Sequence, residues 1–205
     1  NERIHYNVQF DTLNTASGIF YGTQLNGSAA NDSIMINART QDKKAKDWFG
    51  LKASLYAKDK NYSFRLQDSL LLNYEQWNMA ADNYISYSPQ GLIIHNFNLS
   101  SDTAKISINS RQEIVNSPID MIIDNFNLKS ISAILNNDTV FVSGVMDAKM
   151  EVSELNKKLP AFTGDLTITN LAVMEQPLGT LTASAQKKSE SNVVAAMSLI
   201  GNGND

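Results

Sequence analysis

The chain contains two histidines, His5 and His95, and they form no HxxxH, HxH or HExxH pattern. Such patterns bring two imidazoles to one metal ion, so an isolated histidine in a strand is better explained as a structural residue. The absence of Cys excludes disulfides, zinc–thiolate sites and thiol catalysis. The sequence also lacks a nucleophile elbow, a phosphate-binding loop, a dinucleotide-binding glycine pattern and a calcium-binding loop. We therefore expect no enzyme activity and no metal or organic cofactor.

Carboxylates occur in two close pairs, Asp120 with Asp124 and Asp147 with Glu151. A glycosidase needs two carboxyl groups about 5–10 Å apart in a cleft. Each pair falls on one strand face or in adjoining turns, where solvated charge is the ordinary explanation. The carboxylates therefore indicate no reaction, and we expect a protein that binds without catalysis.

One apolar motif with a central Asn occurs three times, as LIIHNFNL at 92–99, MIIDNFNL at 121–128 and LTITNLAV at 166–173. Each copy has apolar residues four and two positions before the Asn and one and three positions after it. Because a strand alternates faces with period two, this apolar set changes register at the Asn. The motif predicts a bulge or corner at Asn96, Asn125 and Asn170; three ordinary strands that share an Asn are the alternative. The central residues are 29 and 45 positions apart, which favours a loose array of β-units over a solenoid of fixed period.

Composition places the chain among globular proteins. Its 205 residues are 42% hydrophobic and 19% charged, enough for a sizeable core. A formal net charge of −4 gives no electrostatic reason to bind nucleic acid or an anionic membrane surface, so we expect no nucleic-acid partner. No apolar run approaches the roughly 20 residues of a transmembrane helix. The first residues lack the apolar core of a signal peptide, so an exported protein must have lost its signal.

Short alternating runs fill most of the chain and predict many β-strands. The clearest run extends from Phe49 to Ala57, with an apolar residue at every second position. A polar turn then leads into a second strand at residues 62–66, which predicts an antiparallel hairpin with one solvent-exposed face. A second hairpin is predicted between 19–25 and 33–39, across the turn-rich residues 26–32.

Three segments depart from this pattern. Residues 128–135, LKSISAIL, place apolar residues at helical spacing and predict one short helix. The polar stretch 73–83 contains Trp77 and Met79; Trp77 is expected to plug the end of a core, and stacking on a ligand is the alternative. The final residues 201–205, GNGND, read as a hairpin turn without a return strand, which suggests a piece of a longer protein. A disordered natural C-terminus is the alternative.

Several motifs follow one another in the order I-x-N-F-x-L, LKSISAIL at 128–135, V-x-G-V-M-D-A-K-M-E-V at 142–152, Pro160, GDLTITNL at 164–171 and PLGTLTA at 177–183. Trp77 and the stretch Asn83-Tyr84-Ile85 precede them. In these features residues 92–185 resemble the TamB-like proteins (translocation and assembly module) of Gram-negative envelopes, large relatives of the AsmA group, and especially their Bacteroidetes members. The N-terminal anchor and the terminal conserved region of that family are absent, so the resemblance implies an internal or C-terminal-half fragment.

This resemblance implies that residues 1–205 form a single β-rich segment of a larger conduit protein. The implied fold is all-β, an elongated and strongly curved antiparallel sheet like a taco or open gutter, with an apolar interior and one short helix near 128–135. Such proteins bridge the periplasm, are implicated in moving phospholipid toward the outer membrane, and are proposed to assist outer-membrane protein assembly. Implied partners are phospholipid acyl chains, flanking segments of the same chain and an outer-membrane β-barrel assembly protein. The implied location is the periplasm, with the full-length protein anchored in the inner membrane.

On this interpretation the chain shields acyl chains in a hydrophobic groove. The predicted lining residues are all aliphatic: Leu92, Ile94, Met121, Ile123, Leu166, Ile168, Leu181 and Met197. The alternative is a β-sandwich module of the cell envelope that binds glycan or protein, with its apolar surface buried between two sheets. A glycan platform needs coplanar Trp or Tyr on a wet face, whereas a lipid groove needs a continuous aliphatic one. An aromatic content of 8%, with Trp48 and Trp77 far apart, favours the groove.

Overall fold

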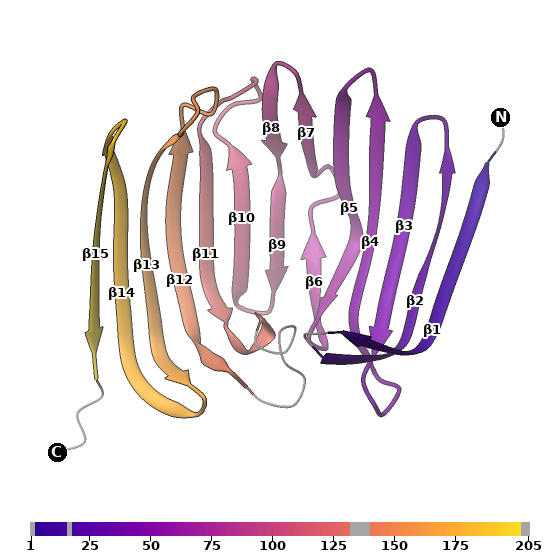
Figure 1. Ribbon diagram of the computed structural model, residues 1–205, viewed down its shortest axis with the longest axis horizontal. Coiled ribbons are helices and arrows are strands. Elements are labelled where there is room, and N and C mark those ends of the chain that lie inside the picture. Colours follow the sequence, from indigo (N-terminus) through magenta and orange to yellow (C-terminus); the bar gives the residue numbers. More distant parts are fainter. Residues whose placement is uncertain (1–2, 16–17, 132–139, 202–205) are drawn as a thin grey trace.

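The computed structural model of this protein describes residues 3–15, 18–131 and 140–201. Within them, fifteen strands form one antiparallel sheet (Figure 1). The strands are β1 (Ile4–Thr15), β2 (Gly18–Ala30), β3 (Ser33–Gln41), β4 (Asp47–Lys58), β5 (Asn61–Leu72), β6 (Glu75–Met79), β7 (Tyr84–Ser88), β8 (Gly91–His95), β9 (Phe97–Ser101), β10 (Ala104–Ser110), β11 (Ile119–Asn127), β12 (Val142–Ser153), β13 (Ala161–Val173), β14 (Gln176–Ser189) and β15 (Asn192–Ile200). The expected all-β antiparallel fold is therefore confirmed.

The strands follow one another across the sheet in the order β1-β2-β3-β4-β5-β6-β9-β10-β11-β12-β13-β14-β15, while β7 pairs with β5 and β8. Pairing is continuous from β1 to β15, and in the described residues these two end strands do not pair with each other. In the described part of the chain the strands therefore form one open sheet.

Asn83 fills a gap in the sheet where β6 ends and β7 begins. Both short strands pair with β5, and the chain leaves the ladder between them. The fully buried Asn83 side chain accepts a hydrogen bond from the Leu66 N–H (3.0 Å) and donates to the Leu66 carbonyl (2.8 Å). Its amide thus replaces the backbone partners that β5 lacks here, as buried backbone groups require.

The predicted bulges at the three motif Asn residues are confirmed. Asn96, Asn125 and Asn170 have positive φ angles of 47°, 52° and 51°. Asn96 separates β8 from β9, and register shifts bracket the other two between Ile123 and Phe126 and between Ile168 and Leu171. At two of these bulges a side chain from the next strand accepts a hydrogen bond from a backbone N–H. The Phe97 N–H donates to Asn109 Oδ1 (3.0 Å), and the Asn125 N–H donates to Asp147 Oδ1 (2.8 Å).

Gly144 is required beside the third bulge. Its φ is 136°, in the region that favours glycine, and it lies at the register shift between β12 and β13. A Cβ placed there would lie 2.9 Å from the Ile168 Cγ2 atom and 2.9 Å from the Thr169 carbonyl oxygen. The glycine in the V-x-G-V-M motif therefore allows β12 to approach the bulged part of β13.

The predicted helix is described only at its start. Lys129–Ile131 are helical, and the Ile131 N–H donates to the Leu128 carbonyl (3.2 Å). The remainder of the predicted segment, 132–135, lies outside the described residues, as do residues 202–205 of the predicted final turn. No helix in the described part of the chain is long and apolar enough to span a membrane.

Two expectations about strand limits were wrong. The hairpin predicted between 19–25 and 33–39 is confirmed as β2 and β3, but its turn is shorter than residues 26–32, because β2 continues to Ala30 and the turn is only Asn31 and Asp32, with φ angles of 48° and 62°. Two consecutive residues with positive φ form the tight turn that suits the twist of a hairpin. The polar stretch 73–83 also contains a strand, β6, because Trp77 and Met79 alternate with polar residues and share one face.

The buried core lies over the middle of the sheet and is built around Trp77. Six buried hydrophobic residues form one cluster, Trp77, Leu99, Phe126, Leu128, Ile168 and Leu171. Trp77 is 1% exposed, and its ring centroid is 5.9 Å from that of Phe126. Trp77 is therefore buried in the core as expected, but it lies within the main cluster, whereas the prediction placed it as a plug at the end of a core.

Candidate functional site: the apolar face of the sheet

One face of the sheet carries an unbroken row of apolar side chains across its C-terminal half. Residues directly opposite each other on neighbouring strands share a face. Eight consecutive strands place an apolar residue in this central row, Met79, Leu99, Ile106, Ile123, Ala148, Leu166, Ala183 and Met197. At about 4.8 Å per strand step, the row extends about 34 Å across the sheet. We call the face that carries it the apolar face.

The N-terminal half has an equivalent row. Seven strands from β1 to β8 place apolar residues opposite one another, Ile4, Ala29, Ile34, Leu55, Phe64, Ile85 and Ile94. Phe64 lies on the same face of β5 as Leu66, and Leu66 packs against the buried cluster around Trp77. The two rows therefore belong to the same face, and between them they reach every strand.

The register places all eight predicted lining residues on the apolar face. Ile123, Leu166 and Met197 belong to the central row, and Ile94 belongs to the N-terminal row. Met121 lies two positions before Ile123, and Leu92 two before Ile94. Ile168 and Leu181 are directly opposite each other in the next row. The three copies of the Asn motif thus contribute to one surface, because each bulge returns the following apolar residues to the same side.

Exposure varies strongly along this face. Ile94 and Ile168 are each 8% exposed, whereas Met197 on the end strand β15 is 77% exposed and Ile4 on β1 is 67% exposed. Side chains of the face itself cover most of its middle, because five of the six residues in the cluster around Trp77 come from the same sheet and the sixth, Leu128, directly follows β11. The apolar surface is thus most open to solvent at the two end strands.

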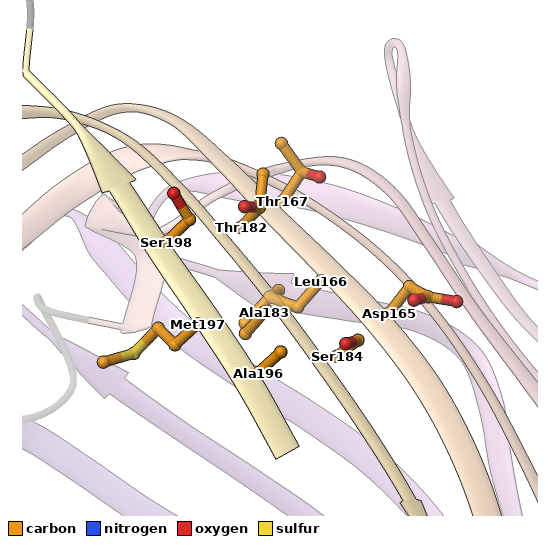
Figure 2. Close-up of a pocket in the computed structure, with 9 residues that line it drawn as sticks. All are labelled: Asp165, Leu166, Thr167, Thr182, Ala183, Ser184, Ala196, Met197 and Ser198. Atoms are coloured by element: carbon orange, nitrogen blue, oxygen red, sulfur yellow. The ribbon is translucent and has the colours of Figure 1, made fainter. Parts of the chain in front are cut away.

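An open hollow lies at the β15 end of the sheet (Figure 2). It is lined by residues of β13, β14 and β15, namely Asp165, Leu166, Thr167, Thr182, Ala183, Ser184, Ala196, Met197 and Ser198. Figure 2 shows Leu166, Ala183 and Met197 on three adjacent strands. Two predicted lining residues, Leu166 and Met197, border this hollow, but the register places the other residues except Ala183 on the opposite face, so the hollow lies mainly on that face.

The opposite face is mainly polar, and three of its charged residues form one network. Arg111 donates to Asp120 Oδ1 (2.7 Å) and to Glu151 Oε2 (2.8 Å), and these carboxylates are directly opposite each other on β11 and β12. The hydrogen bonds to Asp120 and Glu151 raise the pKa of the Arg111 guanidinium above its usual value. Through Arg111, the Asp120 and Glu151 carboxylates link β11 to β12. The Asp147 carboxylate accepts a hydrogen bond from the Asn125 N–H at the bulge.

His95 also lies on the polar face, between two carboxylates. Its Nδ1 is 2.6 Å from Glu113 Oε1 and its Nε2 is 3.3 Å from Asp82 Oδ2. The pKa of Asp82 is lowered, first by the hydrogen bond from the Asn96 side chain and then by His95. Among the described residues no group of three His, Asp or Glu side chains could hold a metal ion.

Sequence reasoning missed part of the central row. Five of its residues were not predicted as lining residues, although each is directly opposite another residue of the row: Met79, Leu99, Ile106, Ala148 and Ala183. Their local signal is alternation with polar neighbours, as in the β12 stretch Met146-Asp147-Ala148. The strand register decides which of the two faces of a strand contributes to the row. Register is set by pairing with a distant segment, so a local pattern does not reveal it.

No family model, curated protein or solved structure matches this chain.

Proposed function

We propose that this chain is a non-catalytic segment of a periplasmic conduit that shields phospholipid acyl chains along its apolar face. The observation that carries the proposal is the pair of apolar rows, which together reach every strand of one open sheet. A surface of this extent in a water-soluble protein marks a binding site for an apolar partner. Burial of about eight methylene groups of one acyl chain would contribute about 6 kcal/mol, without any headgroup contact.

The proposed shape is a gutter curled toward its apolar face. In a flat sheet the three steps from β6 to β11 would separate the strands by about 14 Å. The centroids of the Trp77 and Phe126 rings, which lie on these strands, are 5.9 Å apart. This short distance supports a sheet that bends around the face on which both rings lie.

The proposed location and partners follow from the resemblance of residues 92–185 to TamB-like proteins. On that basis the full-length protein is anchored in the inner membrane and carries phospholipid between the two membranes of a Gram-negative envelope. Flanking segments of the same chain extend the sheet, and an outer-membrane β-barrel assembly protein is the proposed partner at the far end. The lack of Cys is compatible with this compartment.

Native mass spectrometry tests this function. The purified chain is incubated with vesicles of phosphatidylethanolamine and phosphatidylglycerol, separated from them, and weighed intact. We expect added masses that correspond to whole phospholipids, and none after incubation with glycerophosphoethanolamine, the same headgroup without acyl chains. A chain that remains lipid-free, or that acquires glycan or a protein instead, would support the alternative of an envelope binding module.

A further inference from the structure

Tyr62 and Tyr87 form a stacked pair at one rim of the apolar face. They are directly opposite each other on β5 and β7, and their ring centroids are 6.4 Å apart. The rings are side by side in the last row of this face before the hairpin turns, with Leu92 next to Tyr87. They are the last apolar-face residues that a ligand meets on leaving the sheet at this end.

Both phenol groups are free to bind a ligand. Tyr62 and Tyr87 are 45% and 56% exposed, and within the described residues neither hydroxyl has a hydrogen-bond partner. Two of the other five tyrosines use their hydroxyls, since Tyr6 donates to the Met35 carbonyl (2.7 Å) and Tyr74 donates to Asp42 Oδ2 (2.8 Å). The pair at the rim therefore has hydrogen-bonding capacity that the fold does not use.

Polarity changes along the strands at this rim. The row just inside the pair contains Phe64, Ile85 and Ile94, which carry no polar side-chain atom. The next row outward contains the phenols, and the hairpin turns beyond it are polar. A tyrosine ring is an apolar body with a polar tip and suits the boundary between an apolar phase and water. The order from aliphatic to phenolic to polar matches the order from acyl chain to ester to headgroup in a phospholipid.

We propose that Tyr62 and Tyr87 donate hydrogen bonds to the ester or phosphate oxygens of a phospholipid whose acyl chains lie on the apolar face. This inference rests on the proposed function and adds a specific contact to it. The pair selects amphiphiles with acceptor oxygens next to the chains over plain hydrocarbon.

The test compares two probes in variants that keep the rings. Dihexanoylphosphatidylglycerol, a soluble phospholipid, is titrated by calorimetry, and diphenylhexatriene, a hydrocarbon without acceptor oxygens, is titrated by its fluorescence. The variants are Tyr62→Phe, Tyr87→Phe and the double variant, with Tyr56→Phe as the control. Tyr56 is 40% exposed and lies on the polar face, opposite Ser63.

Each rim substitution is expected to raise the Kd for the phospholipid about two- to tenfold, the range for one hydrogen bond. Diphenylhexatriene binding should stay unchanged in every variant, and Tyr56→Phe should behave as the unmodified protein. Equal phospholipid affinity in all variants would overturn the inference while leaving the proposed function intact. A parallel loss of diphenylhexatriene binding would assign the pair a structural role instead. Failure of the unmodified protein to bind either probe would reject the proposed function itself.

Discussion

Replacing Ile123 with Arg is expected to weaken phospholipid binding at least tenfold while the protein remains folded. Ile123 lies in the middle of the central row, between Ile106 on β10 and Ala148 on β12. A guanidinium there either displaces acyl chains or must be buried among them, and an unpaired charge is expensive to desolvate. Because Ile123 is only partly buried, the long side chain can reach solvent when no lipid is bound. Lipid binding is measured by native mass spectrometry and stability by thermal unfolding.

The adjacent residue provides a matched control. Ile122 has the same chemistry but lies on the polar face, where it is 38% exposed and opposite Lys149. Ile122→Arg should leave lipid binding within about twofold of the unmodified protein, since surface substitutions have small effects. Ile168→Arg, at 8% exposure in the buried cluster, should lower stability more than either. Loss of folding in Ile123→Arg, or equal loss of binding in Ile122→Arg, would count against an accessible apolar face.

Replacing Trp77 with Ala is expected to lower the free energy of unfolding by about 3–5 kcal/mol, the usual range for a buried Trp. Trp77 is 1% exposed and packs against Phe126 in the core cluster, which also contains Leu99. The cavity would open where β6 and β11 are held together, so the loss should affect the whole sheet. Urea unfolding followed by far-ultraviolet circular dichroism measures the change.

Trp77→Phe serves as the graded control. Within the described residues the Trp77 Nε1 atom is buried without a hydrogen-bond partner. Phe keeps a ring in the cluster and removes this unpaired donor, so part of the lost packing is offset. We expect less than half the destabilisation of the Ala variant. Similar losses in the two variants, or a loss under about 1 kcal/mol for Trp77→Ala, would show that this contact does not organise the core.

Features that depend on neighbouring residues could be predicted from the sequence. The shift of the apolar pattern at Asn96, Asn125 and Asn170 lies within eight residues each time, so the bulges and their common face could be inferred locally. Alternation likewise identified the 49–57 strand, which forms part of β4. Each of these inferences needs only the period of a strand and the backbone preference of Asn.

Features that depend on distant partners could not be predicted. Asn83 binds the backbone of Leu66, 17 positions away, and nothing near Asn83 in the sequence indicates this role. Trp77 was expected in the core, but its contact with Phe126 depends on the order of β6, β9, β10 and β11 in the sheet. The unused hydroxyls of Tyr62 and Tyr87 emerge only once the register places them together at a rim.

Site-specific photocrosslinking on β13 tests most directly whether acyl chains lie on the apolar face. A benzophenone amino acid replaces Leu166, which belongs to the central row, or Thr167, which is adjacent and opposite Thr182 on the polar face. Each protein is illuminated with vesicles that contain phospholipid radiolabelled in its acyl chains. If acyl chains lie on the apolar face, we expect labelled lipid attached at position 166 and little or none at 167. Equal labelling at the two positions, or no labelling at 166, would contradict this expectation.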